Sequence, residues 1–213
     1  MTDTTHRTIK IWQQNTRKSL AAHLAMLHSI ENAYDIICIQ EPAFDFLANT
    51  RATPVWTVVK PTSWKGKENG KPYPRVITLV HERLSTNGWT QIDIKSLDVV
   101  AIQLKGESGE INIYNIYNDC THSETLEVMR KHLDEREEEE EAQEQPEKVV
   151  GDVWLGDFNR HHPMWEKEDN LRLFTNRNLE DATVLTGLLA EHGMQMTLPH
   201  GTPTIRNTAG NLT

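Results

Sequence analysis

The sequence of 213 residues has no long apolar run and only two cysteines. No stretch approaches the roughly 20 apolar residues that cross a bilayer, which predicts the absence of a membrane-spanning helix. Met1 to Lys10 contains no apolar stretch of the signal-peptide type. Cys38 lies in an apolar run and Cys120 in a polar one, so they form neither a metal-binding spacing nor a disulfide framework. We therefore expect an intracellular protein in a reducing compartment, with no membrane partner.

Basic residues are fewer than acidic ones, and the formal net charge is −9. This charge is concentrated, because the segment 134–147 alone carries nine acids and one base, a local −8, which leaves −1 for the rest of the chain. A run of like charges is typical of a solvated or disordered insert. We expect one domain spanning 1–213, with 134–147 as a flexible acidic insert. The nearly neutral remainder can still present a basic face to nucleic acid.

The first forty residues predict a strand, a helix and a second strand. Thr8 to Gln14 alternates apolar and polar residues, as a strand does. A helix follows, capped by Thr16 or Ser19. The run Asp35 to Pro42 is apolar on both faces, which is typical of a central strand that is buried on both sides. The apolar face of the helix is predicted to consist of Leu20, Leu24 and Leu27, widened by Met26 and Ile30.

Polar residues stand where both of these strands end. Asn15 follows the first strand and Glu41 follows the second. In a strand–helix–strand unit, ligands gather outside the carboxyl ends of the strands, so both residues are candidates for a functional site. The alternatives are a turn or cap for Asn15 and a loop-facing surface position for Glu41.

A lysine-rich loop separates two predicted strands, 55–59 and 76–80. Its residues 60–75 include five bases and one acid, with Trp64 and Tyr73 interleaved. Cations that bind phosphates, beside rings that stack on bases, suit a contact with nucleic acid. A solvated hairpin loop is the alternative. The residues predicted to contact nucleic acid are Lys65, Lys67, Lys71, Arg75 and, further along the chain, Arg160.

A hairpin is predicted in the middle of the chain. Residues 98–104 and 110–117 are both strand-like and are joined across 106–109. Tyr117 ends the second strand and is the third polar group at a strand end. The alternative is a buried tyrosine whose hydroxyl group makes a structural hydrogen bond.

Two helices are predicted in the second half of the chain. The first begins with a capping box, Thr121 to Glu124, and the second runs from 178 to 192 and ends at Gly193. Residues 194–198 are predicted as a strand. The inward-facing residues are Leu126, Met129 and Leu133 in the first helix, and Ala182, Leu185 and Leu189 in the second.

A short apolar run from Val153 to Leu155 breaks into Gly156, Asp157, Phe158 and Asn159. Asp157 and Asn159 project from the same side of an extended segment, because side chains alternate along a strand. A carboxylate can hold a metal or steer a water molecule, and an adjacent amide can donate to a charged oxygen. The pair therefore suits metal-assisted hydrolysis of a phosphate ester. An ordinary Asx-type turn is the alternative.

In their order and spacing, these motifs together resemble the endonuclease/exonuclease/phosphatase superfamily. The continuation His161 to Trp165 is most similar to the apurinic-like endonuclease domain of non-LTR (LINE-type) retrotransposons. The resemblance covers the chain from about Thr8 onward. The motifs that carry it are Asn15 after a strand, Gln40-Glu41-Pro42, Asn115-Ile116-Tyr117, Gly156-Asp157-Phe158-Asn159 and Thr202-Pro203-Thr204.

This resemblance implies an α/β fold, namely a four-layered α/β sandwich of two packed mixed β-sheets flanked by helices. It also implies a Mg²⁺-dependent phosphodiesterase that nicks DNA, with Mn²⁺ as a second metal option. The implied metal ligands are Glu41 and its neighbour Asn15. The other implied roles are contact with the scissile phosphate for Tyr117, activation of the attacking water for Asp157, stabilisation of charge on phosphoryl oxygens for Asn159, and the family threonine for Thr204, ahead of Thr202.

The superfamily pattern continues with an Asp and a Ser-Asp-His segment, and neither occurs before Thr213. We therefore expect either a fragment of a longer reading frame or a relic that has lost the final strands. Two functions stay open: a Mg²⁺-dependent endonuclease, and a catalytically silent nucleic-acid-binding or interaction module of the same fold. A phosphatase acting on another phosphate ester is a third. A retrotransposon origin implies a nuclear location, and the sequence indicates no oligomeric state.

Overall fold

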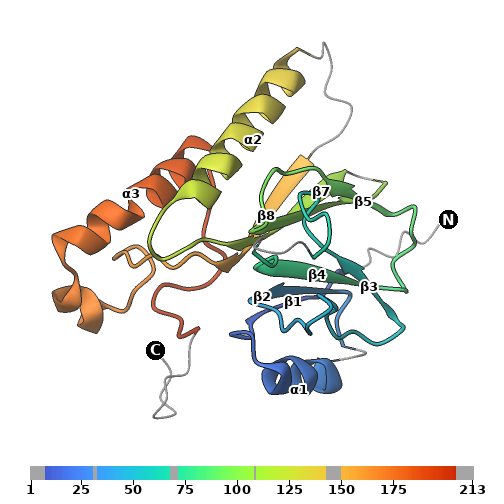
Figure 1. The fold of residues 1–213 in the computed structure, drawn as a ribbon. Coiled ribbons are helices and arrows are strands. Elements are labelled where there is room, and N and C mark those ends of the chain that lie inside the picture. The colour runs from blue at the N-terminus through green and yellow to red at the C-terminus, as the bar shows by residue number, and fades with distance from the viewer. Residues whose placement is uncertain (1–7, 31–32, 68–71, 108, 143–149, 205–213) are drawn as a thin grey trace.

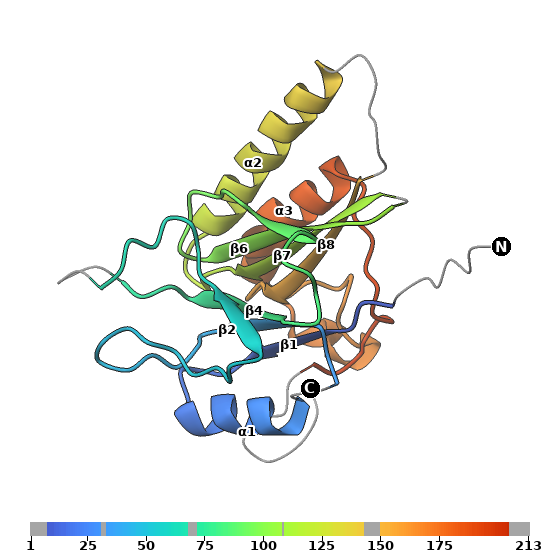
Figure 2. The same ribbon diagram turned by 90° about the vertical axis from the view of Figure 1, so that its right-hand side faces the viewer.

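The structure, a computed structural model, describes residues 8–30, 33–67, 72–107, 109–142 and 150–204 (Figure 1). Its eight strands form two four-stranded sheets, and its helices cover the outer faces of both sheets (Figures 1 and 2). The layers are therefore helix, sheet, sheet and helix, which confirms the predicted four-layered α/β sandwich.

The first sheet has the strand order β1-β2-β4-β3, and the second has the order β5-β6-β7-β8. Each sheet is mixed, because β1 pairs with β2 and β7 pairs with β8 in parallel, while the other neighbours are antiparallel. The strands of the first sheet are β1 Ile11–Asn15, β2 Ile36–Gln40, β3 Trp56–Val59 and β4 Val76–His81. Those of the second are β5 Trp89–Ile92, β6 Val99–Lys105, β7 Glu110–Tyr117 and β8 Val150–Asp157.

Helix α1, Leu20–Ile30, covers the first sheet, and helices α2, Glu124–Glu141, and α3, Asn176–Glu191, cover the second. A short 3-10 helix, η1, spans Glu168–Leu173. None of the described helices is both long enough and apolar enough to cross a membrane. The core between the sheets is formed by aliphatic residues of both, among them Ile36, Val80, Ile102 and Ile113.

Strand β2 explains why the sheets pack as they do. All five of its residues are buried, as the continuous apolar run predicts. Its last residue, Gln40, carries a polar side chain between the sheets, where its amide donates to Asn115 Oδ1 of β7 at 2.6 Å. Asn115 in turn donates to the carbonyl of Ile77 in β4 at 2.8 Å. These buried hydrogen bonds fix the ends of β2, β4 and β7 relative to one another.

The buried face of the N-terminal helix α1 is only partly the one predicted. Leu20 and Leu24 are 47% and 46% exposed, whereas the buried residues are His23, Met26, Leu27 and Ile30. The predicted and observed stripes share Met26, Leu27 and Ile30, which are buried as expected, and packing against the sheet decides which residues complete the stripe. The prediction for Leu20 and Leu24 is therefore wrong.

Three other local expectations differ from the structure. Helix α2 starts at Glu124 with Ser123 as its N-cap, because Thr121 is hydrogen-bonded to Asp119 instead of forming the predicted capping box. Residues 134–141 of the acidic run continue α2, and 143–147 lie outside the described residues. Residues 194–198 pair with no strand and form no β-structure.

The two cysteines lie in opposite environments, which gives a direct test of the fold. Cys38 in β2 is fully buried, and burial raises the pKa of its thiol to about 12, while Cys120 is exposed. We expect a thiol reagent to modify one cysteine, Cys120, in the native protein and both after unfolding. Mass spectrometry after labelling with and without denaturant measures this, and native labelling of Cys38 would contradict the burial of β2.

Candidate active site

Three of the predicted site residues meet where the strands of the two sheets end. Asn15 is the last residue of β1, Glu41 follows β2 and Asp157 is the last residue of β8. The Asn15 amide donates to Glu41 Oε1 at 3.0 Å and to Asp157 Oδ2 at 2.7 Å. Its own oxygen, Oδ1, accepts the backbone N–H of Arg17 at 2.8 Å. One amide group therefore holds two carboxylates from different sheets beside each other.

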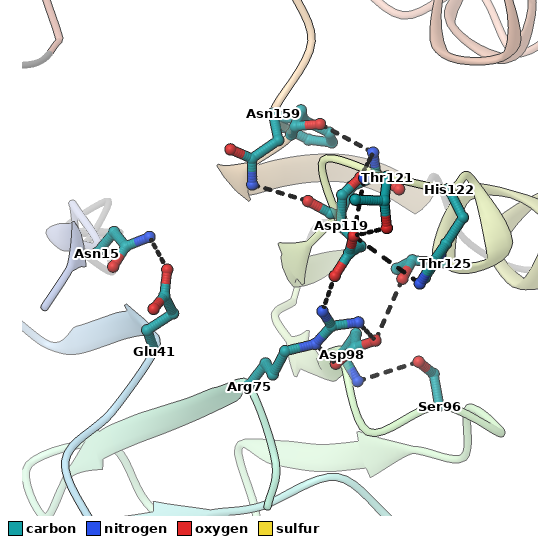
Figure 3. Close-up of polar contacts among 12 residues, drawn as sticks. Asn15, Glu41, Arg75, Ser96, Asp98, Asp119, Thr121, His122, Thr125 and Asn159 are labelled. Carbon is teal, nitrogen blue, oxygen red and sulfur yellow. Dashed lines mark hydrogen bonds and ion pairs between the residues drawn. The ribbon is translucent and has the colours of Figure 1, made fainter. Parts of the chain in front are cut away.

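The backbone of Glu41 is held in an uncommon conformation. Its φ of +46° lies in the left-handed region, which costs a non-glycine residue about 1 kcal/mol or more. Hydrogen bonds on both sides fix it: Glu41 N–H donates to the carbonyl of Arg75 at 2.7 Å, and its carbonyl accepts from the Thr16 hydroxyl group and from Lys18 N–H, both at 2.8 Å. This turn aims the carboxylate at Asn15 (Figure 3).

The two carboxylates are not neutralised by a cation. Among the described residues, neither Glu41 nor Asp157 forms an ion pair. Within the same part of the chain, no group of three or more His, Cys, Asp or Glu side chains could hold a metal. The site instead offers two carboxylates, those of Glu41 and Asp157. This suits Mg²⁺, since this ion is usually bound by one or two carboxylates together with water and substrate phosphate.

The close pairing of β8 with β7 sets the position of Asp157. The ladder pairs Gly156 with Ile116 and Asp157 with Tyr117. A Cβ atom on Gly156 would lie 1.9 Å from the carbonyl oxygen of Ile116, so no side chain fits at this position. Glycine before Asp157 therefore lets the strand approach closely enough to set the carboxylate beside the end of β7.

Asn159 lies at the same edge but is turned toward the neighbouring loop. Its φ is +49°, and its side-chain amide donates to the carbonyl of Asn118 at 2.8 Å. Its backbone N–H makes a longer bond to Asp157 Oδ1 at 3.3 Å. Asn118 returns the contact by donating to the carbonyl of Phe158 at 2.9 Å. The loops after β7 and β8 are thus tied together.

Tyr117 completes the edge from the end of β7. Burial raises the pKa of its phenol, and the nearby carboxylates of Glu41 and Asp157 raise it further, so the hydroxyl group stays protonated at neutral pH. The guanidinium carbon of Arg75 lies 4.7 Å from the centre of the tyrosine ring. Tyr117 is therefore paired with Asp157 in the ladder of β7 and β8 and lies under the Arg75 cation.

Arg75 carries an ion-pair network that the sequence did not reveal (Figure 3). Its guanidinium donates to both oxygens of Asp98, at 2.6 and 2.5 Å, and to Asp119 Oδ2. Two hydrogen bonds from Thr121 hold the pKa of Asp119 well below its usual range, and Arg75 adds to this effect. The side chains of Arg75, Asp98 and Asp119 are 26%, 15% and 20% exposed. The network joins the start of β4 to the loops before β6 and after β7.

Of the five residues predicted to contact nucleic acid, the two arginines are held by several polar partners within the protein, whereas Lys65 and Lys67 each donate to one backbone carbonyl, that of Thr62 and that of Phe46. Arg75 is paired as described, and Arg160 is buried, with its guanidinium donating to the carbonyls of Asp119, Asn159 and His122 and to Ser123 Oγ. Both guanidinium groups hold loops around the site; Arg160 is buried, and Arg75 is partly exposed with its donors directed at Asp98 and Asp119. Lys65 and Lys67 are exposed, and Lys71 lies outside the described residues.

The threonine motif is not joined to this site by any hydrogen bond among the described residues. Thr204 is exposed, and Thr202 Oγ1 donates to the carbonyl of Pro199 at 2.6 Å. The segment packs instead near Trp165, whose carbonyl accepts the N–H of Gly201 at 3.2 Å.

The structure thus brings together Asn15, Glu41, Tyr117, Asp157 and, at the adjacent loop, Asn159. The residues that sequence reasoning missed are Asn118, Asp98 and Asp119, of which Asn118 and Asp119 directly follow the Tyr117 motif.

Comparisons with known proteins agree with the fold. Residues 111–213 match the family model described as "Endonuclease-reverse transcriptase". The structure is similar to the endonuclease domain of TRAS1, a telomere-specific non-LTR retrotransposon, with a TM-score of 0.62 and 16% identity over 94% of this chain and 78% of that one. It is also similar to the AP endonuclease LMAP from Leishmania major, with a TM-score of 0.56 and 14% identity over 85% of this chain and 66% of that one. No curated protein matches the sequence.

These findings agree on the fold of the protein. The chain has the fold of the endonuclease/exonuclease/phosphatase superfamily, and the resemblance predicted from the sequence motifs is confirmed. Within that class, its C-terminal half carries the sequence pattern of the endonuclease-reverse transcriptase family.

Proposed function

We propose that this chain is the endonuclease domain of a retrotransposon-type protein and that it nicks DNA in a Mg²⁺-dependent reaction. One observation carries the proposal: the amide of Asn15 holds the carboxylates of Glu41 and Asp157 side by side, and neither carboxylate forms an ion pair with another described residue. Two like charges so placed are unfavourable unless a cation binds between or beside them. Similarity to nuclease structures supports the choice of DNA as substrate.

The residues of the site have distinct parts in this reaction. Glu41, fixed by its strained turn, presents a carboxylate to the metal. Asp157 orients or deprotonates the attacking water, and Tyr117, whose hydroxyl group stays protonated, donates a hydrogen bond to the scissile phosphate. Asn159 stabilises charge on the phosphoryl oxygens. Its side-chain amide does so after releasing the carbonyl of Asn118, or the adjacent backbone does so in its place. Asn15 keeps both carboxylates in place, and its own place in the metal shell stays a prediction.

The residues present fit Mg²⁺, since they supply hard oxygen ligands from two carboxylates. When bound, the ion supplies charge neutralisation at the phosphate and lowers the pKa of water. The protein positions the attacking water and the phosphate in line, and this positioning is most of what displacement at phosphorus requires.

A supercoiled plasmid tests the proposal. We expect the protein to convert it to the relaxed, nicked form with Mg²⁺ or Mn²⁺ and to leave it intact with EDTA or Ca²⁺. Agarose electrophoresis measures the conversion, and bis-p-nitrophenyl phosphate and a phosphoinositide serve as the alternative phosphate esters.

The controls separate the candidate functions. Hydrolysis of the phosphoinositide without plasmid nicking would move the substrate class to small phosphate esters. DNA binding without nicking, in this chain and in one extended past Thr213 from its gene, would instead identify a silent binding module and overturn the proposed endonuclease.

A further inference from the structure

A turn just after Glu41 holds two large apolar side chains in solvent. Phe46 and Leu47 are 76% and 60% exposed, which makes them the most exposed large apolar side chains of the described residues. The turn is firmly built: Asp45 Oδ1 accepts the N–H groups of Leu47 and Asn49 at 2.9 Å each, and Asp45 N–H donates to the carbonyl of Asn49 at 2.9 Å. These side chains are displayed by a preformed turn.

Aromatic rings and lysines surround the base of this turn. Phe44 stacks on Tyr73 with ring centres 5.4 Å apart, and Trp64 lies 6.0 Å from Tyr73. Two amino groups contact the turn itself. Lys60 donates to the carbonyl of Ala48 at 3.2 Å and lies 5.7 Å from the centre of the Phe44 ring, and Lys67 donates to the carbonyl of Phe46.

The chemistry of this surface selects its partner. Phe46 and Leu47 cannot bind phosphate, but apolar side chains of this kind enter between base steps and unstack them. Exposed lysines beside them can bind the phosphates that flank such a step. A second copy of the chain fits less well, because pairing two copies of this surface would bring Lys65 and Lys67 of both copies together.

The position of the turn sets where it would act. Phe46 is five residues from Glu41, so their Cα atoms are at most about 17 Å apart. With base pairs spaced about 3.4 Å apart, this reach corresponds to about five base pairs from the phosphate at the carboxylate pair.

We infer that Phe46 and Leu47 form a wedge that enters the base stack of duplex DNA within about five base pairs of the phosphate held at the active site. The inference rests on the proposed function for its substrate class. It adds that the bound duplex is unstacked, and that a deformable base step is part of what the protein selects.

Permanganate, which oxidises unstacked thymines, tests the wedge without requiring cleavage. The full chain is bound in EDTA to an end-labelled duplex with thymines in both strands. We expect thymine oxidation to rise on binding and to fall to the level of free DNA with the double substitution Phe46→Ser/Leu47→Ser. Affinity should fall about 5- to 100-fold, as for the loss of one stacked base.

Two further variants serve as controls. Leu20→Ser/Leu24→Ser on α1 removes apolar side chains of similar size that are 47% and 46% exposed, and it should change neither affinity nor oxidation. Lys65→Gln/Lys67→Gln should weaken binding and its salt dependence while leaving oxidation unchanged at saturating protein. Thermal unfolding checks that each variant folds.

The outcomes separate this inference from the proposed function. Nicking of DNA without thymine oxidation would overturn the wedge and leave the endonuclease intact. Oxidation without nicking in Mg²⁺ would leave the wedge and overturn the endonuclease. Absence of both DNA binding and Mg²⁺-dependent nicking overturns both proposals. A dimer in light scattering that the Phe46→Ser/Leu47→Ser variant dissociates would assign the surface to a second copy of the chain.

Discussion

Replacing either member of the carboxylate pair, by Glu41→Gln or Asp157→Asn, is expected to lower Mg²⁺-dependent nicking by about three orders of magnitude or more, since catalytic groups that act as a unit are lost together. Each substitution keeps an amide oxygen where Asn15 donates, at 3.0 and 2.7 Å. The fold should therefore survive, and the lost activity should reflect the missing charge.

The same variants should differ from ordinary core mutations in their stability. Removing one of two neighbouring like charges without a cation present should leave the thermal unfolding temperature unchanged or raise it. The wild-type protein should gain stability on addition of Mg²⁺, because the ion binds the folded state, and both variants should lose that gain. Differential scanning calorimetry with and without Mg²⁺ measures both effects.

Glu180→Gln provides the matched control, because Glu180 is an exposed residue of α3 far along the chain from the site motifs. It should change neither nicking nor the response to Mg²⁺. If Glu41→Gln retained both nicking and the Mg²⁺-dependent gain in stability, Glu41 would not be a metal ligand, and the proposed site would have to be abandoned.

The elements that were predicted correctly are those whose hydrophobic pattern is determined by local burial and by the adjacent turn. β2 is apolar at every position because both of its faces are covered, and the hairpin of β6 and β7 follows from alternation around a glycine-containing turn. The meeting of Asn15, Glu41 and Asp157 was predictable for a related reason, since each residue stands at the end of a strand.

The acidic run shows where local pattern fails. Its charge predicts disorder, but glutamate also favours helix, and residues 134–141 continue α2 beyond the core. Arg136 stabilises this extension by pairing with Glu140 one turn on and with Asp152 of β8 at 2.7 Å. His192 at the end of α3 contacts Glu137 at 2.6 Å. Asp152 and His192 lie outside the acidic run, so counting charges within the run could not find these two contacts.

The arginines show the same limit within the site. Composition marks Arg75 and Arg160 as cations in polar loops and does not tell a paired cation from a displayed one. Their partners come from other elements: Asp98 and Asp119 for the first, and three carbonyls and a serine for the second. The exposed lysines of the loop 60–67 therefore stay the better candidates for nucleic-acid contact.

Arg75 should prove more important for shaping the site than for binding DNA. Its carbonyl accepts the N–H of Glu41 at 2.7 Å, its guanidinium covers Tyr117, and its ion pairs hold Asp98 and Asp119. Arg75→Met should lower the free energy of unfolding by about 1–3 kcal/mol, because two partly buried carboxylates lose their cation. Arg75→Lys should lower the free energy of unfolding by a smaller amount, since an ammonium group cannot replace the two parallel hydrogen bonds to Asp98.

The nicking assay and DNA affinity together decide how Arg75 acts. We expect Arg75→Met to slow nicking through misplacement of Tyr117 while its Kd for DNA stays near the wild-type value. Adding Asp98→Asn to Arg75→Met should recover part of the stability, because one unpaired charge is removed. Lys65→Gln is the contrasting variant, since it should weaken binding without loss of stability. If Arg75→Met instead behaved like Lys65→Gln, with weaker, less salt-dependent binding and unchanged stability, Arg75 would be a DNA contact, as its loop composition predicts.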